Sequence, residues 1–356
     1  MKFDQRSSRR HFVIVAGSLL VVLLAKTSRG QIDGPQLGYV LDKRDGMLRP
    51  ILGVPGASRL GDPLPLGLTL ASAEISSKQD YALGVTQTDG KLVRITFGKG
   101  DQPSSAQTIE SLGPGASHIT LSDKGKSAAV VFPQSQSLRI LTGLPETPQF
   151  DWEVDLRLAG LPEAVALDDE GKVVILSVSE NQASRISLYS RETGLQSLGI
   201  FGKVSALKLS ANQQVLVADR ETQEVILIRD VLGTAQRMRL AGREDGIDDP
   251  VALEFSNDQT RVFVANAGSR SVAALSLEGE PAALTLCDCT PTTLKKLDGD
   301  GVFRLTELSE KPLLMLEATA TETRVLFVPN GGAALNRAER ERRATLPVAA
   351  RRSRLP

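Results

Sequence analysis

One pattern of alternating apolar residues occurs six times along this chain, and it constrains the fold more than any other feature. In each copy a first strand ends at a small polar residue, and a short polar turn and a second apolar strand follow. We call these closing residues the anchors: Ser76, Ser122, Asp168, Ser210, Ser256 and Asp298. They lie 46, 46, 42, 46 and 42 residues apart. Such a period is typical of repeat proteins in which each unit packs on its neighbours.

The residues around the anchors predict β-strands. Five copies have apolar residues one and three positions before the anchor, as Leu209 and Leu207 stand before Ser210. This spacing puts both side chains on one face of a strand. Segments 173–176, 215–218 and 262–265 are almost wholly apolar, as in strands covered on both faces. Third strands are predicted at 138–141, 186–189, 225–228 and 272–275, and weaker fourth strands at 154–158, 198–201, 238–240 and 282–286.

Four short antiparallel strands in a unit of this length predict an all-β fold, the β-propeller. Helical repeats are disfavoured because no long helical stripe is present. We expect seven blades, with six as the alternative, because the unit at the N-terminal end is weak. Its second and third strands are predicted at 38–41 and 47–52, a fourth within 62–70 and a first within 31–36. The last unit is completed by 302–305, 313–317 and 324–329.

The clearest unit runs from Asp248 to Val272. It contains a strand led by Pro250, the turn Ser256-Asn257-Asp258 and the strand Val262-Phe263-Val264-Ala265-Asn266. This unit resembles the repeat of YVTN- and NHL-type β-propellers, in which a Pro-led strand, a turn and a Val-Ala-Asn strand recur. Phe263 stands where the first family has its name-giving tyrosine. The resemblance covers roughly residues 70–330 and implies the fold, but propellers carry many unrelated chemistries.

Relatives of this kind include lactone hydrolases and quinone-dependent dehydrogenases. After residue 30 the chain has one histidine, His118, and one tryptophan, Trp152. The paired histidines of some propeller lactonases and the tryptophan docking pattern of quinoproteins are therefore missing. Metal-dependent lactonases use Glu, Asn and Asp in the central channel, but no position here matches them by motif. We assign no catalytic or metal-binding residue and expect no cofactor.

Residues 1–30 are predicted to be a secretory signal peptide, because a cationic start precedes an apolar segment and small residues. An uncleaved membrane anchor is the alternative, and it is less favoured because the apolar segment 12–25 is short for a spanning helix. Ser8-Arg9-Arg10-His11-Phe12-Val13 resembles the twin-arginine export motif, with Ile14 where that motif favours lysine. We expect an exported protein in the periplasm or outside the cell.

Three local features could bind ligands. Cys287-Asp288-Cys289 could form a local disulfide in an oxidising compartment, stay as two buried thiols, or hold a soft metal. We favour a structural role. Asp298-Gly299-Asp300-Gly301 resembles the start of a calcium loop but lacks the later acidic ligand, so a turn is favoured. The acidic segment 244–249 could collect a divalent cation, and a solvated turn is favoured there too.

Charge limits the partners. Lys plus Arg equals Asp plus Glu, 42 each, so no overall field attracts nucleic acid. The segment 330–356 is different because it carries seven arginines and two glutamates. We predict a basic, disordered tail that makes weak contact with anionic surfaces.

We therefore predict a signal peptide at 1–30, a propeller at 31–329 and a tail at 330–356. The expected function is a non-catalytic scaffold that binds another protein or a cell-envelope polymer, because loops on a rigid frame are common binding sites. The alternative is a metal-dependent, lactonase-like hydrolase that uses acidic residues of the channel.

Overall fold

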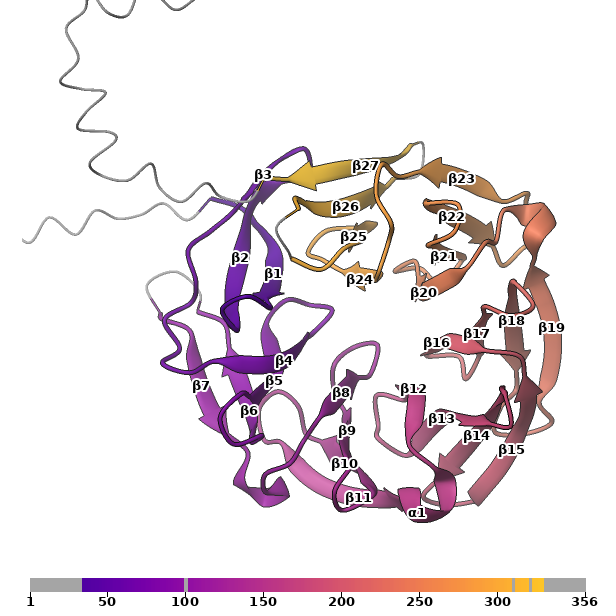
Figure 1. The fold of residues 1–356 in the computed structure, drawn as a ribbon, viewed down its shortest axis with the longest axis horizontal. Coiled ribbons are helices and arrows are strands. Elements are labelled where there is room, and N and C mark those ends of the chain that lie inside the picture. The colour runs from indigo at the N-terminus through magenta and orange to yellow at the C-terminus, as the bar shows by residue number, and fades with distance from the viewer. Residues whose placement is uncertain (1–33, 99–101, 309–310, 320–321, 330–356) are drawn as a thin grey trace, which may run out of the picture. The chain divides into compact units, whose positions relative to one another are not determined.

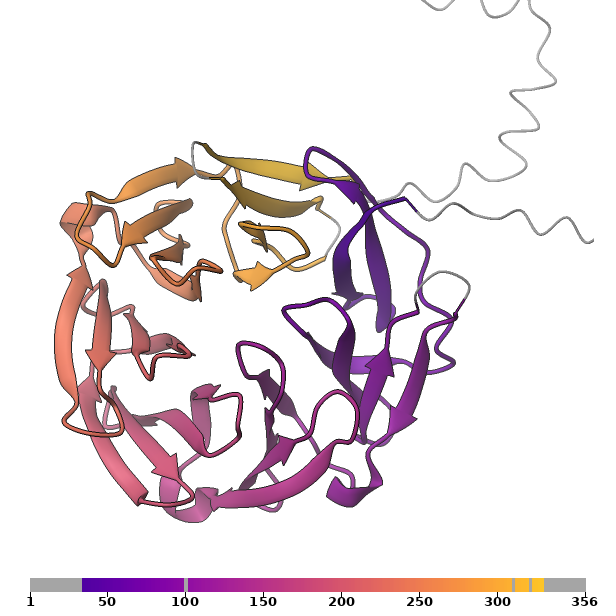
Figure 2. The same cartoon turned by 180° about the vertical axis from the view of Figure 1, so that it is seen from behind.

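The computed structural model of the chain describes residues 34–98, 102–308, 311–319 and 322–329. Seven antiparallel sheets surround a central axis as the blades of a propeller, and the chain visits them in order (Figures 1 and 2). Six sheets have four strands, and the first has three within the described residues. The predicted all-β, seven-bladed fold is confirmed, and six blades is wrong.

The blades are numbered 1 to 7 along the chain. Blade 1 is formed by β1 (Gln36–Asp42), β2 (Met47–Val54) and β3 (Ala57–Leu60), blade 2 by β4 (Leu70–Ile75), β5 (Tyr81–Thr86), β6 (Leu92–Thr96) and β7 (Ser105–Thr108), and blade 3 by β8 (His118–Leu121), β9 (Ala128–Phe132), β10 (Ser137–Thr142) and β11 (Gln149–Asp155). Blade 4 is formed by β12 (Pro162–Leu167), β13 (Val173–Glu180), β14 (Ala183–Ser190) and β15 (Gly194–Phe201), and blade 5 by β16 (Val204–Leu209), β17 (Val215–Asp219), β18 (Glu224–Arg229) and β19 (Gln236–Ala241). Blade 6 is formed by β20 (Pro250–Phe255), β21 (Arg261–Asn266), β22 (Ser271–Ser276) and β23 (Ala283–Leu286), and blade 7 by β24 (Lys295–Lys296), β25 (Val302–Arg304), β26 (Leu313–Ala318) and β27 (Thr323–Val328). Helix is limited, in the described part of the chain, to α1 (Leu156–Ala159) and two 3-10 turns, η1 (Glu110–Leu112) and η2 (Arg243–Asp245).

The repeat determines this layout through the turn after each anchor. The residue three positions beyond the anchor has a positive φ in all six copies: Gln79, Gly125, Gly171, Gln213, Gln259 and Gly301. This left-handed residue lets the chain reverse between the first and second strands. The second strands β9 and β17 are buried at every residue, because neighbouring blades cover both faces of the sheet.

Blade 1 differs from the sequence-based expectation. Its outer strand is β3, at residues 57–60, so the fourth strand predicted within 62–70 is wrong. Pro63 and Pro65 lack the amide hydrogen that a sheet ladder needs. Instead, Leu64 and Leu66 pack on the core between blades 1 and 2. Of the first strand predicted within 31–36, residues 31–33 lie outside the described part, and Gln36 begins β1.

The inner edge of β1 is covered by pieces of two other blades. The backbone N–H of Asp298 in blade 7 donates to the carbonyl of Leu37, at 2.7 Å. The side chain of Gln79 in blade 2 accepts from the N–H of Tyr39 at 3.0 Å. It also donates to the carbonyl of Lys296 at 2.9 Å. These contacts close the ring where blade 1 has no fourth described strand.

The core consists of layers between adjacent blades, built mainly from Val, Leu, Ile and Ala. One layer joins β13 and β14 of blade 4 to β16 and β17 of blade 5. Another joins β1 and β2 of blade 1 to β26 of blade 7. Every blade therefore depends on its neighbours for burial.

The predicted signal peptide at 1–30 and tail at 330–356 lie outside the described residues. Among the residues that are described, no helix has the length and apolar character needed to cross a membrane.

Candidate functional site

The inner strands β4, β8, β12, β16, β20 and β24 surround the propeller axis (Figure 1). The position two residues before the anchor repeats once in each of these strands. Its occupants are Glu74, Thr120, Ala166, Lys208, Glu254 and Lys296. Four of the six are charged, although inner strands are otherwise mostly apolar. Three of these side chains, those of Lys208, Glu254 and Lys296, meet near the axis as ion pairs.

A chain of ion pairs crosses the channel. Glu254 Oε2 of blade 6 lies 2.6 Å from Lys208 Nζ of blade 5. Glu254 Oε1 lies 3.6 Å from Lys296 Nζ of blade 7. Lys296 Nζ then lies 3.0 Å from Oδ1 of Asp123, which belongs to blade 3 on the far side of the ring. We call Lys208, Glu254, Lys296 and Asp123 the channel ion-pair chain. A separate pair joins Lys295 to Glu74 of blade 2.

These charges are partly or fully removed from water. The side chain of Glu254 is 3% exposed and that of Lys296 is 11% exposed. Burial by itself lowers the pKa of Lys208, but its contact with Glu254, aided by Asp123 and Glu74, outweighs that effect and raises the pKa above its ordinary value. Lys208 therefore keeps its positive charge beside Glu254.

Beside these pairs the channel holds a cavity of about 260 Å³. Three residues that line this cavity are exposed and lie at the start of an inner strand or shortly before it: His118, Glu163 and Thr292. Side chains near the strand ends, such as Glu254 and Leu209, are buried. The cavity thus opens at the end where the inner strands begin, and we call His118, Glu163 and Thr292 the channel mouth.

His118 faces this cavity from the start of β8. Although His118 lies at the exposed mouth, the surrounding inner strands partly shield its ring from water and so lower its pKa; Glu74 acts in the opposite direction, and Lys295 lowers the pKa further. The imidazole is therefore neutral at pH 7. Trp152, the other residue singled out in the sequence, packs beside the core of blades 3 and 4 and donates from Nε1 to the carbonyl of Gly171 at 2.6 Å.

The two acidic segments noted in the sequence form turns. Residues 298–301 link β24 to β25, and Asp300 accepts a hydrogen bond from Asn257 at 3.0 Å. In the segment 244–249, Glu244 pairs with Arg239 and Asp249 pairs with Arg220. Nowhere in the described residues do three or more His, Cys, Asp or Glu side chains come together as metal ligands would.

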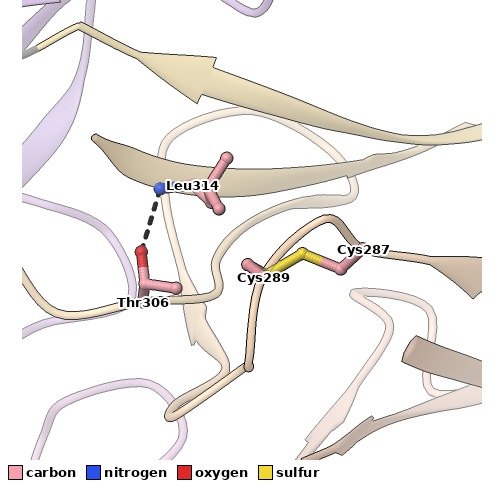
Figure 3. Close-up of a disulfide and its surroundings, with 4 residues drawn as sticks. All are labelled: Cys287, Cys289, Thr306 and Leu314. Carbon is pink, nitrogen blue, oxygen red and sulfur yellow. Dashed lines mark hydrogen bonds between the residues drawn. A yellow bond between two sulfur atoms is a disulfide. The ribbon is translucent and has the colours of Figure 1, made fainter. Parts of the chain in front are cut away.

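Cys287 and Cys289 are joined in a disulfide on the link between β23 and β24 (Figure 3). Cys287 is buried with Phe303 and Leu316 of blade 7. Cys289 is half-buried and lines a surface groove. Beyond the disulfide, Thr306 accepts a hydrogen bond from the backbone N–H of Leu314 at 3.0 Å (Figure 3).

Sequence reasoning missed the channel ion-pair chain. The signal was present, because charged residues at the same inner-strand position in consecutive copies are unusual for strands near an axis. The sequence does not show that Lys296 reaches Asp123, since those residues belong to blades that are distant along the chain.

No protein-family model matches the chain, and no curated protein matches its sequence. Solved structures are similar in fold. The WD40 repeats of RRP9 match with a TM-score of 0.53 and 12% identity, over 74% of this chain and 81% of that one. A catalytically inactive variant of virginiamycin B lyase from Staphylococcus aureus, bound to quinupristin, matches with a TM-score of 0.52 and 12% identity, over 73% of this chain and 84% of that one. At this level of identity the likeness shows the propeller fold alone.

Proposed function

We propose that this chain is an exported, non-catalytic propeller that binds another protein or a cell-envelope polymer at its channel mouth. The pairing of the channel charges carries this proposal. Each buried carboxylate of the channel ion-pair chain contacts a lysine, so these groups hold the ring together instead of facing a substrate. The open mouth offers polar groups on a rigid frame.

Export and repeat type belong to the same proposal. The layout of residues 1–30 supports export into the periplasm or beyond, and a disulfide between Cys287 and Cys289 is compatible with an oxidising compartment. The segment 248–272 supports a YVTN- or NHL-type repeat through its Pro-led strand and its Val-Ala-Asn strand.

A pull-down from cell-envelope extract tests the proposal, with residues 31–356 as bait. Glu163→Arg reverses an exposed charge at the mouth, at the start of β12. Glu170→Arg is the matched control, because Glu170 is also exposed and lies in the turn after the same strand. We expect one partner to be retained by the unaltered protein and by the control and to be lost with Glu163→Arg. Recovery of the same partner by all three baits would contradict binding at the mouth.

The hydrolase alternative gains no support from a specific observation. The channel carboxylates that a divalent cation would need are in contact with lysines. Turnover of a lactone that disappears on chelation would nevertheless favour that alternative over the scaffold.

The basic tail supports a second, weaker contact. We propose that arginines of 330–356 attract anionic surfaces in a salt-sensitive way. Deleting these residues should abolish binding to vesicles that contain anionic lipid. Unchanged binding, or none before the deletion, would exclude this role.

A further inference from the structure

A groove of about 830 Å³ lies between blades 6 and 7. Its walls include Leu286 at the end of β23, Cys289, and Leu314, Val325 and Phe327 of blade 7. Figure 3 shows Cys289 on the linker and Leu314 on β26 beside it. We call this the blade 6–7 groove.

The groove exposes large apolar side chains. Leu286 is 78% exposed and Phe327 is 66% exposed. Single exposed apolar residues are ordinary, but apolar side chains that share a concave surface mark a place where something binds. The groove shares Thr292 with the channel mouth, but its apolar walls lie outside the mouth, and neither the ion-pair chain nor the proposed scaffold function uses them.

The chain itself continues from the wall of this groove. Val325 and Phe327 belong to β27, which ends at Val328, and residues 330–356 follow after Pro329. A flexible segment of the length between Val328 and Leu346 has an end-to-end distance of roughly 23 Å, so it can fold back onto the blade that it leaves. A tethered segment also has an effective concentration on the order of millimolar, which favours it over a free competitor.

One part of this tail matches the groove in chemistry. Leu346-Pro347-Val348-Ala349-Ala350 is apolar, with an arginine pair on each side, at 342–343 and 351–352. The groove is mainly apolar, and its rim carries Asp288, Glu307 and Lys311, of which Glu307 is already paired with Arg304 and Lys43. An apolar segment between cationic ends thus meets an apolar floor with the carboxylate of Asp288 at its rim.

We propose that Leu346–Ala350 folds back into the blade 6–7 groove of its own chain, with a flanking arginine beside Asp288 at the rim. The tail then covers Leu286 and Phe327. An outside partner that uses the groove must displace it.

Photo-crosslinking in the full chain tests this inference. With p-benzoylphenylalanine in place of Leu286, irradiation should join residue 286 to the tryptic peptide 344–351, which contains the whole apolar segment. The matched control carries the same group at Leu195, which is 62% exposed on the outer strand β15 of blade 4. A second variant, Leu346→Asp with Val348→Asp, should lose the crosslink while the propeller, which ends before these residues, stays folded.

The possible outcomes separate the occupants. A crosslink within one chain at position 286, absent at position 195 and lost in the double variant, supports the inference. A crosslink between light and heavy copies in an isotope-mixed sample would overturn it and indicate a second copy in the groove. Absence of the peptide 344–351 from the crosslinked products would also overturn it.

Discussion

Gln79 occupies the same turn position as Gln213 and Gln259, three residues after the anchor, with φ values of 55°, 57° and 57°. Of these three glutamines, Gln79 alone has a side chain that forms hydrogen bonds to other blades among the described residues. It bonds to the backbone groups of Tyr39 and Lys296. Gly38 faces it closely, since a Cβ at residue 38 would lie 2.4 Å from Gln79 Oε1. One side chain therefore partly replaces the strand that blade 1 lacks.

Gln79→Ala should lower the free energy of unfolding by about 2 kcal/mol, because it leaves two backbone groups without these partners. Gln213→Ala is the matched control, since it changes the same residue type at the same left-handed turn position. It should cost less than about 0.5 kcal/mol, as surface substitutions usually do. Urea denaturation measures both. Equal losses would show that Gln79 acts through its turn alone.

The burial of Tyr81 predicts that the free energy of unfolding falls at alkaline pH. Its hydroxyl donates to the carbonyl of Gly125 at 2.5 Å, and the ring is buried. Burial, reinforced by nearby carboxylates such as Asp80, raises the pKa of Tyr81 well above its ordinary value near 10. Above pH 10 the unfolded chain loses this proton while the folded chain keeps it, so stability falls as pH rises. The raised pKa of Lys208 acts in the same direction.

Tyr81→Phe separates the contribution of Tyr81 to this alkaline loss of stability from that of Lys208. At pH 7.5 it should cost about 1 kcal/mol through the lost hydrogen bond. Between pH 9.5 and 11.5 its stability should decline less steeply than that of the unaltered protein, and Lys208 should account for part of the remaining decline. Urea midpoints across this pH range provide the measurement. Parallel declines would exclude a role for Tyr81.

At the scale of the element, the strand β20 delivers Glu254 to two lysines of neighbouring blades. Glu254→Gln should lower the free energy of unfolding by about 2–3 kcal/mol, because Lys208 loses its carboxylate partner and the buried Lys296 keeps only Asp123. Adding Lys208→Met should recover part of the loss, so the pair should show coupling in a double-mutant cycle. Glu180→Gln is the control, because it breaks an ion pair with Arg185 in which the glutamate side chain is half exposed. It should change the free energy of unfolding by less than about 1 kcal/mol. Additive losses for Glu254 and Lys208 would contradict the coupling.

The link between β23 and β24 gives a different prediction. A disulfide that closes a loop of three residues stabilises by only about 1–2 kcal/mol, because little chain entropy is removed. Cys287→Ser with Cys289→Ser should therefore leave the propeller folded and slightly less stable in urea. Thiol labelling of the unfolded protein should increase when reductant is added. Equal labelling with and without reductant would show that the bond is not formed.

The elements that could be predicted are those with a clear two-residue period. For example, the second and third strands predicted for blades 5 and 6 begin and end within one or two residues of the bounds of β17, β18, β21 and β22. The sixth copy broke the pattern at Lys295, and the structure explains why: β24 has two residues, and Lys295 pairs with Glu74 of blade 2. β3 was missed because Ala57-Ser58-Arg59-Leu60 has neither alternation nor β-branched residues.

For the whole molecule, the repeat predicted seven blades, with six as the alternative, but it did not predict how the ring closes. A repeat determines contacts between consecutive units, whereas closure joins blade 7 to blades 1 and 2, which are far apart in the sequence. The channel ion-pair chain depends on the same closure, because Lys296 and Asp123 meet only in the completed ring. Periodicity carries no information about contacts across the axis.

Removal of blade 1 tests how strongly the ring depends on closure. Deleting residues 34–61 removes Val40 and Ile51 from the core layer shared with blade 7, and Leu48 from the layer shared with blade 2. Each such loss costs about 2–5 kcal/mol, and together they exceed the roughly 5–15 kcal/mol that stabilises a typical domain. We expect the shortened chain to lose its cooperative urea transition and to associate through the uncovered faces of blades 2 and 7. Deleting 330–356 is the control and should leave the transition intact, because those residues lie beyond the last strand. A cooperative, monomeric transition in the shortened chain would show that six blades can close without the first.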